Sequence, residues 1–373
     1  MVPISGKLKT NFFNLPGWHT RKRIIVFESD DWGSIRIPSR ETYVYLLNSG
    51  YQIDNVSYGK DCLESNDDIT CLLQVLADFK NQDGQYPVFT MNFIMANPDF
   101  KRIEQADFQE YFYEPFSETY KRYPCHDKSL QLIKQGLNDS LLKPQLHGRE
   151  HLNFIRWLNF LKQGSKEILD LFGRSLYGVP NSVSNGGRRD FQRAFDYDDE
   201  CESKYSCHII EDAIKLFNKI WGFSSRSFIA PNFFWDTYIE KCLSENKIFY
   251  IQGQRAQFLS DLTGRYKARY HFTGQKNKFG QIYLIRNCYF EPCFDRNKDW
   301  INSCLAEIAQ SFLLHKPAVI STHRVNYIGS ISETNRDKSL YGLSALLSEI
   351  IRKWPDVIFL STDQLGDMIS MKN

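Results

Sequence analysis

Two adjacent aspartates follow a stretch of sequence that has the pattern of a buried β-strand. Residues 24–27 are apolar, three of them are β-branched, and the chain continues through Glu28, Asp30 and Asp31 to Gly33. Such a run is typical of a strand that is buried on both faces. Burying unpaired carboxylates is costly, so acidic side chains at the carboxyl end of this strand indicate a functional site.

A helix cap is the other interpretation of these acidic residues, because Asp and Ser are preferred where a helix begins after a strand. One aspartate would be enough for a cap, whereas this chain has two in succession. Asp30 and Asp31 are adjacent and would point in different directions. We therefore expect one of them to bind a metal ion and the other to handle a proton.

Three histidines follow other predicted strands. His147 and His151 are four residues apart after a predicted strand at 144–146, and His323 follows one at 318–322. On a helical turn, the first spacing would place both imidazoles on one face, a common way to bind zinc or a similar ion. Each histidine alone could be a capped or core residue. Two histidines and one aspartate would leave positions open for water and substrate, as in catalytic zinc sites.

Predicted strands and helices alternate along the chain, which indicates a parallel sheet covered by helices. About seven or eight strand–helix units favour an α/β fold of the distorted (β/α)7–8 barrel type. Residues 255–278 are basic and have no clear period. The predicted strands are 24–27, 86–93, 144–146, 175–179, 227–230, 248–252, 281–286, 318–322 and 357–360. The predicted helices are 41–48, 67–80, 129–142, 149–163, 207–221, 236–246, 300–315 and 337–353.

Composition and charge restrict the class of protein. The chain has 373 residues with a net charge of +2, which gives no argument for a nucleic-acid partner or an anionic membrane. No apolar run reaches the length of a membrane span, and the first ten residues lack the apolar segment of a secretory signal. The nine cysteines include no Cys-x-x-Cys pair. Cys201 with Cys207, or Cys288 with Cys293, could pair locally, but we expect reduced thiols and a cytoplasmic location.

The domain prediction is a single barrel over residues 1–373. The gap between Asp31 and His147 is long. We expect residues 94–125, which are rich in aromatic and acidic side chains, to form an insertion over the cleft.

Four segments resemble, in order, the motifs of the polysaccharide deacetylase family (carbohydrate esterase family 4). They are SDDWG at 29–33, LHGREH at 146–151, FIAPNFFW at 228–235 and ISTHRVNY at 320–327. The resemblance implies a distorted barrel that uses a divalent ion to remove acetyl groups from N-acetylated or O-acetylated sugars of a glycan or its precursor. The ion would be Zn²⁺, with Co²⁺, Mn²⁺ and Ni²⁺ as alternatives. The implied roles are general base for Asp30, metal ligand for Asp31, His147 and His151, and general acid for His323.

The chain departs from the family pattern in two places. The third motif usually has an Arg shortly before a Pro, and this Arg braces the catalytic aspartate. Here Pro231 matches, but Arg226 is displaced, and no segment matches the fourth motif. The residues expected to bind the carbohydrate substrate are Trp32, Arg149, Arg189, Arg193, Pro231, Asn232 and Trp235. Arg189 and Arg193 lie on a polar loop that either meets an anionic group or is solvated surface.

Two alternatives to a deacetylase remain. A glycoside hydrolase on a related barrel would need two opposed carboxylates. Glu28 or Asp30 would then pair with Asp196, Asp198 or Glu291. The second alternative is a carbohydrate-binding protein without activity. The sequence does not indicate an oligomeric state.

Overall fold

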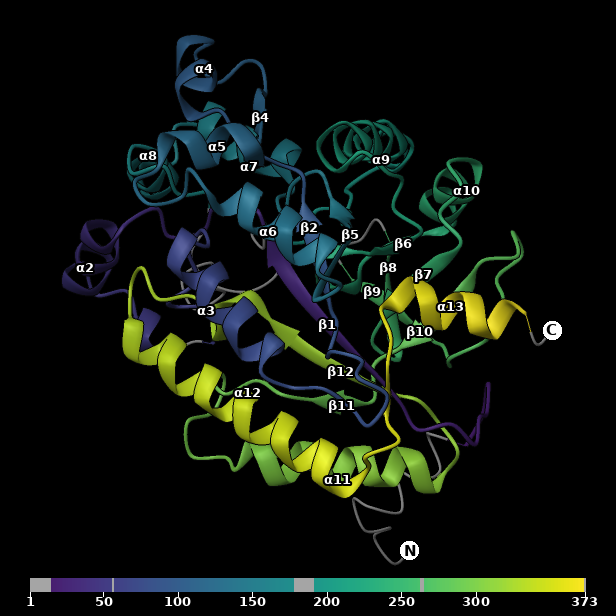
Figure 1. Cartoon of the computed structure of the whole chain (residues 1–373). Coiled ribbons are helices and arrows are strands. Elements are labelled where there is room, and N and C mark those ends of the chain that lie inside the picture. The colour runs from purple at the N-terminus through teal and green to yellow at the C-terminus, as the bar shows by residue number, and fades with distance from the viewer. Residues whose placement is uncertain (1–14, 56, 178–190, 262–264, 372–373) are drawn as a thin grey trace, which may run out of the picture.

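A curled parallel sheet forms the centre of the structure, which is a computed structural model that describes residues 15–55, 57–177, 191–261 and 265–371 (Figure 1). Its strand order is β10-β7-β6-β5-β2-β1-β12-β11, and β13 pairs with β1. All residues of β1 are buried, as the apolar run predicts. The strands are β1 (Ile24–Trp32), β2 (Phe89–Ile94), β5 (Leu142–Gly148), β6 (Ser227–Ile229), β7 (Tyr250–Gly253), β10 (Ile282–Ile285), β11 (Cys288–Tyr289), β12 (Ala318–His323) and β13 (Ile358–Phe359).

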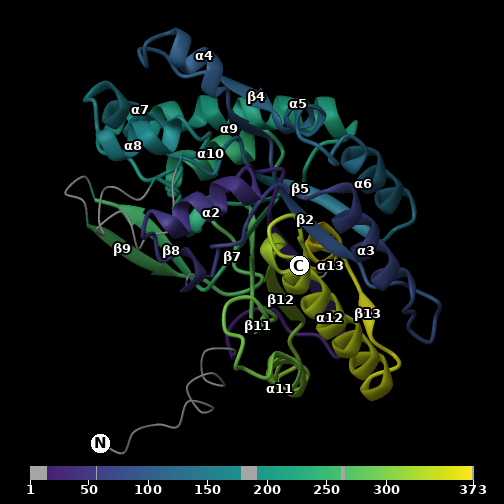
Figure 2. The same cartoon turned by 90° about the vertical axis from the view of Figure 1, so that its left-hand side faces the viewer.

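Helices surround this sheet (Figures 1 and 2). In α12, Leu340, Leu343, Leu347 and Ile350 repeat at helical spacing and are buried, while the polar face is left outward. The predicted α/β fold of the distorted barrel type is therefore confirmed. The helices are α2 (Arg40–Asn48), α3 (Asn66–Ala77), α6 (Ser129–Asn138), α7 (Phe154–Lys162), α8 (Lys166–Phe172), α9 (Glu200–Trp221), α10 (Thr237–Glu245), α11 (Trp300–Leu313), α12 (Glu333–Lys353) and α13 (Thr362–Ser370).

Residues 94–125 form β3 (Ala96–Pro98), α4 (Phe100–Gln105), β4 (Tyr113–Pro115) and α5 (Phe116–Arg122). Asn97 of this segment supports the loop after the two aspartates. Its side chain accepts a hydrogen bond from the Ile35 amide at 2.7 Å and donates one to the Gly33 carbonyl at 2.9 Å. The segment thus positions the first motif. Its role as a cover over the cleft stays a prediction.

The structure corrects three predicted elements. Residues 255–278 are not irregular throughout, because β8 (Ala256–Ser260) and β9 (Tyr266–Tyr270) form an antiparallel hairpin. Residues 175–177 are not in a strand, and 178–179 lie outside the described residues. The helix predicted from residue 149 begins at Phe154, where the Asn153 side chain caps it by accepting from the Arg156 amide.

The cysteine prediction is also wrong. Cys207 on α9 and Cys242 on α10 form a disulfide, whereas Cys201, Cys288 and Cys293 are free. The pair was not visible in the sequence because its members are 35 residues apart and meet only when α9 packs against α10. Among the described helices, none combines the length and apolar character that a membrane crossing requires.

Candidate active site

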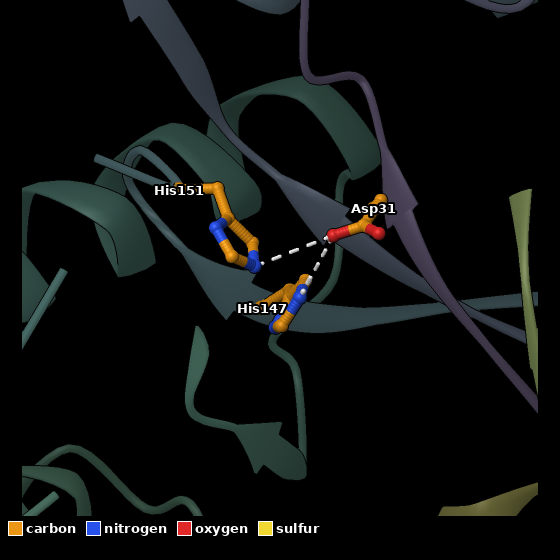
Figure 3. Close-up of side chains that lie close together, drawn as sticks. All are labelled: Asp31, His147 and His151. Carbon is orange, nitrogen blue, oxygen red and sulfur yellow. Dashed lines mark ion pairs between the residues drawn. The ribbon is translucent and has the colours of Figure 1, made fainter. Parts of the chain in front are cut away.

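Three side chains with metal-binding atoms converge at the carboxyl ends of β1 and β5 (Figure 3). Oδ1 of Asp31 lies 3.5 Å from Nε2 of His147 and 3.4 Å from Nε2 of His151. Ligands placed tetrahedrally at zinc bonding distances are about 3.4 Å apart. All three side chains are buried, so the cluster fits a small divalent ion held away from bulk water.

The two histidines reach this cluster from different backbone contexts, which corrects the expected helical turn. His147 lies in β5, while His151 lies in the loop before α7. Gly148 lies between them and has a φ of +117°, a backbone conformation that residues other than glycine rarely adopt. Nδ1 of His147 donates to the Ile229 carbonyl at 2.9 Å, which leaves Nε2 as the free ligand atom. Burial keeps the pKa of His151 well below its usual value, and this favours the neutral imidazole that a metal requires.

A backbone irregularity brings Asp30 and Asp31 into one cavity. The pairing of β1 with β2 shifts register between Ser29 and Trp32, and Asp31 has φ of +75°. In a regular strand, adjacent side chains would lie on opposite faces of the sheet. Non-glycine residues with this φ are strained and are found at functional sites.

Asp30 is held by a buried arginine that the sequence analysis did not identify. Arg286, directly after β10, donates from Nη2 to Oδ1 of Asp30 at 2.6 Å and from Nη1 to Oδ2 at 2.7 Å. Asn92 donates to Oδ1 at 2.7 Å. Burial alone would raise the pKa of Asp30, but Arg286 outweighs it and lowers the pKa to about 2. Asp30 is therefore a carboxylate at neutral pH.

His323 is paired with Glu291. The sequence did not predict this pairing. Nδ1 of His323 lies 2.6 Å from Oε1 of Glu291, and Asn326 donates to Oε2 at 2.8 Å. Burial lowers the pKa of His323, but Glu291 and the nearby aspartates raise it more, to about 9. The imidazolium can thus donate a proton from Nε2, which lies 3.7 Å from Oδ2 of Asp30.

The displaced arginine of the third motif has a different task. Arg226 pairs with Asp367 of α13, with Nη2 of the arginine 2.6 Å from Oδ1. Arg286 and Glu291 each come shortly after a predicted or observed strand end. That position was the available signal. The sheet order places β11 beside β12, which carries His323, whereas β10 lies at the opposite edge and its Arg286 reaches Asp30 because the sheet curls.

Comparisons with known proteins give structural matches only, because no protein-family model and no curated protein matches the sequence. A protein from Parabacteroides distasonis assigned as a glycoside hydrolase/deacetylase matches with a TM-score of 0.50 and 8% identity. The match covers 96% of this chain and 73% of that one. The chain has a polysaccharide deacetylase-like fold.

Two further structures match less closely. A protein from Mycobacterium smegmatis assigned as a polysaccharide deacetylase has a TM-score of 0.44 and 12% identity, over 96% of this chain and 93% of that one. A CE4 family pseudoenzyme from Bacillus anthracis has a TM-score of 0.39 and 9% identity, over 93% of this chain and 66% of that one.

In this deacetylase-like fold, the clustered residues line a cavity of about 170 Å³. Asn232, predicted to bind substrate, is in its wall, next to Phe233. None of the described lining residues comes from 94–125. The described lining residues are Asp30, Asp31, Arg36, Tyr58, His147, His151, Gln192, Ala230, Asn232, Phe233 and His323.

Two predicted aromatic binding residues are wrong. Trp32 is 0% exposed, and its Nε1 donates to Ser29 at 3.0 Å, so that it packs in the core and offers no ring face to a sugar. Trp235 is 1% exposed, and its Nε1 donates to Glu240 at 3.2 Å. Both rings lost their predicted role because packing of the barrel covers them.

The remaining residues that were predicted to bind the substrate do not line the described cavity wall. Pro231 is buried beside the cavity wall without lining it. Arg149 is also buried and pairs with Glu150 and Asp212 outside the lining residues. Arg193 lies over the Phe234 ring at 4.8 Å. Arg189 lies outside the described residues, so its role is untested.

Proposed function

We propose that this protein is a metal-dependent carbohydrate deacetylase, which releases acetate from N-acetylated or O-acetylated sugars of a glycan or a glycan precursor. One observation carries the proposal. The Asp31, His147 and His151 donors share a single cavity with the side chains of Asp30 and His323. Amide hydrolysis needs an electrophile for the carbonyl, an acceptor for the proton of water and a donor for the leaving amine.

Asp31, His147 and His151 would hold the ion. A bound divalent ion would supply Lewis acidity, polarising the acetyl carbonyl and lowering the pKa of water. Two histidine nitrogens and one carboxylate oxygen are a donor set that suits Zn²⁺ and leaves room for further ligands.

Asp30 and His323 move the protons. Oδ2 of Asp30 accepts a hydrogen bond from Nη1 of Arg286 and retains a lone pair, with which it takes the proton of the attacking water. Nε2 of His323 then protonates the leaving nitrogen, because Glu291 occupies Nδ1. Oδ2 and Nε2 are 3.7 Å apart, which is too close for a substrate to lie between them. The two groups therefore face the same part of the cavity.

Three of the carboxylates named for a glycoside hydrolase pair with arginines. Glu28 contacts Arg286 at 2.7 Å. Asp196 and Asp198 both pair with Arg156, at 3.1 and 3.0 Å. Neither these three acids nor Glu291 is among the described residues that line the cavity. A second carboxylate opposite Asp30, which glycosidic cleavage needs, is thus lacking in the described lining, apart from Asp31 of the metal-binding cluster.

An acetate-release assay on zinc-loaded protein tests the function. We expect acetate from an N-acetylated sugar, loss of that activity with a chelator, and its return when Zn²⁺ is restored. Release of free sugar from a glycoside with the acetamide intact would move the assignment to glycoside hydrolysis. Sugar binding without acetate release would instead support the carbohydrate-binding alternative.

A further inference from the structure

Arg36 is a cation in the wall of the candidate active site that neither the metal-binding cluster nor the proton-transfer pair uses. It follows β1 in the loop that leads to α2, and it lines the same cavity as Asp31 and His151. Its side chain is 7% exposed, and Nη2 lies 3.4 Å from Oδ1 of Asp31, the oxygen that would hold the ion. A group bound beside the ion is therefore within reach of this guanidinium.

Arg36 has weaker partners than the other buried arginines of the site. Its contacts with Asp31 and Asp61 are both 3.4 Å. By contrast, Arg324 contacts the same Asp61 at 2.9 Å, and Arg286 contacts Asp30 at 2.6 Å. Nη1 of Arg36 has no hydrogen-bond partner within the described part of the chain. A buried cation with unused donors costs stability, which a bound acceptor would recover.

Metal binding would leave Arg36 still less well paired. The Asp31 carboxylate would share its charge with the ion. Asp61 shares its charge with Arg324, which donates two hydrogen bonds to Oδ1 at 2.9 and 3.1 Å, and its Oδ2 stays 3.4 Å from Nε of Arg36. A cation next to a divalent ion repels it, so metal binding alone gives Arg36 no purpose in this position. A negatively charged ligand would interact favourably with both positive centres. Guanidinium binds carboxylate and phosphate through paired N–H donors.

We propose that Arg36 selects substrates that carry an anionic group, a carboxylate or a phosphate, close to the acetyl group that is removed. This inference rests on the proposed function and adds a substrate class to it. Arg36 binds and orients the anion and takes no part in proton transfer.

The surface beside the cavity carries the same sign of charge. Phe234 follows the cavity residue Phe233 and packs against Phe258 of β8, with 5.4 Å between ring centroids. The partner strand β9 exposes Lys267 and Arg269. Exposed cations near a cavity raise the local concentration of anionic ligands.

The test compares three probes on zinc-loaded protein. N-acetylglucosamine is neutral. N-acetylmuramic acid carries a carboxylate in a lactyl ether on the carbon next to the acetamido carbon, and N-acetylglucosamine 1-phosphate carries a phosphate on the neighbouring carbon of the other side. Calorimetry gives Kd for each probe, and acetate release gives kcat/KM. We expect the native protein to prefer one or both anionic probes by about 10- to 100-fold, the range for a charge-assisted hydrogen bond. The preferred probe identifies the anion.

Three variants separate the possible causes of a preference for anionic probes. In Arg36→Gln the preference should fall to within about 2-fold, while affinity for the neutral probe changes little. Arg36→Lys keeps the charge without the paired donors and should retain part of the preference. Lys219→Gln removes one exposed positive charge from α9 and should leave the preference unchanged. Bound zinc and circular dichroism check that each variant is folded and loaded.

Two results would overturn the inference. One is equal binding of neutral and anionic probes by the native protein. The other is an equal loss of affinity for all probes in Arg36→Gln, which would assign Arg36 to support of the site. If no probe releases acetate but the preference persists in Kd, the proposed function fails and the anion site stands.

Discussion

At the scale of single residues, one backbone feature lets Asp30 and Asp31 do different work in the same cavity. The positive φ of Asp31 turns its carboxylate toward the two histidines, while Asp30 faces Arg286. The strain of that conformation, of order 1–3 kcal/mol, is tolerated because the surrounding packing fixes the loop. Asp31→Gly would relieve the strain but would also remove a ligand.

The metal assignment predicts separate behaviour of ligands and proton-transfer residues. His147→Ala and His151→Ala should each lose the bound ion in elemental analysis, because each removes one of three donors. Asp30→Asn and His323→Ala should keep the ion and lose about 10²- to 10⁴-fold in turnover. The loss in the double variant should be less than additive if both act in one step. Unchanged ion content in both histidine ligand variants would refute the metal assignment.

The ion pair of His323 with Glu291 predicts a defined pH dependence. A general acid must be protonated, so activity should fall as pH rises through about 9, the raised pKa of His323. Glu291→Gln removes the main cause of the raised pKa of His323. The loss of activity at high pH should therefore begin at a lower pH in this variant. The same pair stabilises the fold fully below the unfolded pKa of about 6.5, and this contribution is lost as pH rises through about 9.

Nuclear magnetic resonance titration of His323 measures this pKa without relying on turnover. An unshifted His323 titration in Glu291→Gln would contradict the assignment.

At the scale of elements, the site depends on strands that are distant in sequence and joined through one arginine. Arg286 follows β10 and contacts both Glu28 at 2.7 Å and Asp30 at 2.6 Å, within β1. All three side chains are nearly or fully buried. The guanidinium therefore compensates two carboxylates that would otherwise be costly to bury, and it aligns the proposed base.

Arg286→Met should therefore destabilise the protein by about 3–5 kcal/mol, the usual effect of leaving a buried charge unpaired. Chemical denaturation measures the free energy of unfolding. Arg226→Met is the matched control, since Arg226 also pairs with an aspartate but has a side chain that is 39% exposed. The control should cost no more than about 1 kcal/mol. A loss of no more than about 1 kcal/mol in Arg286→Met, as in the control, would show that the charge on Arg286 is not needed to bury Glu28 and Asp30.

At the scale of the whole molecule, packing brings together cysteines that the sequence keeps apart. The Cys207–Cys242 disulfide joins α9 to α10 on the outside of the barrel (Figure 1). It closes a loop of about 35 residues, for which the chain-entropy estimate is a stabilisation of about 3–4 kcal/mol.

Alkylation of the denatured, unreduced protein should modify seven of the nine cysteines. Reduction should lower Tm, and Cys207→Ser combined with Cys242→Ser should lower it to the same extent, with no further effect of reductant. Modification of all nine cysteines would show that the thiols are reduced, as the sequence analysis expected.

The sequence by itself determined the parts of this protein that depend on local order. The period of apolar residues predicted most strands and helices, because a buried strand and an amphipathic helix have different repeats. Asp30, Asp31, His147, His151 and His323 were identified because each follows a predicted strand. Parallel strands bring such residues to the same end of a barrel.

The tertiary structure decided which of these side chains meet and what supports them. Arg286 reaches Asp30 from the opposite edge of the sheet because the sheet curls, and Glu291 reaches His323 because β11 pairs with β12. Arg36 is close to Asp31 in the sequence, but only the packed structure shows that its side chain lines the cavity. The turn at Gly148 and the positive φ of Asp31 replaced the expected helical turn and alternating strand. Trp32 stands beside the aspartates in the sequence, yet the barrel buries it completely. Burial and pairing across the sheet are properties of the packed molecule, and the residues adjacent in the sequence do not determine them.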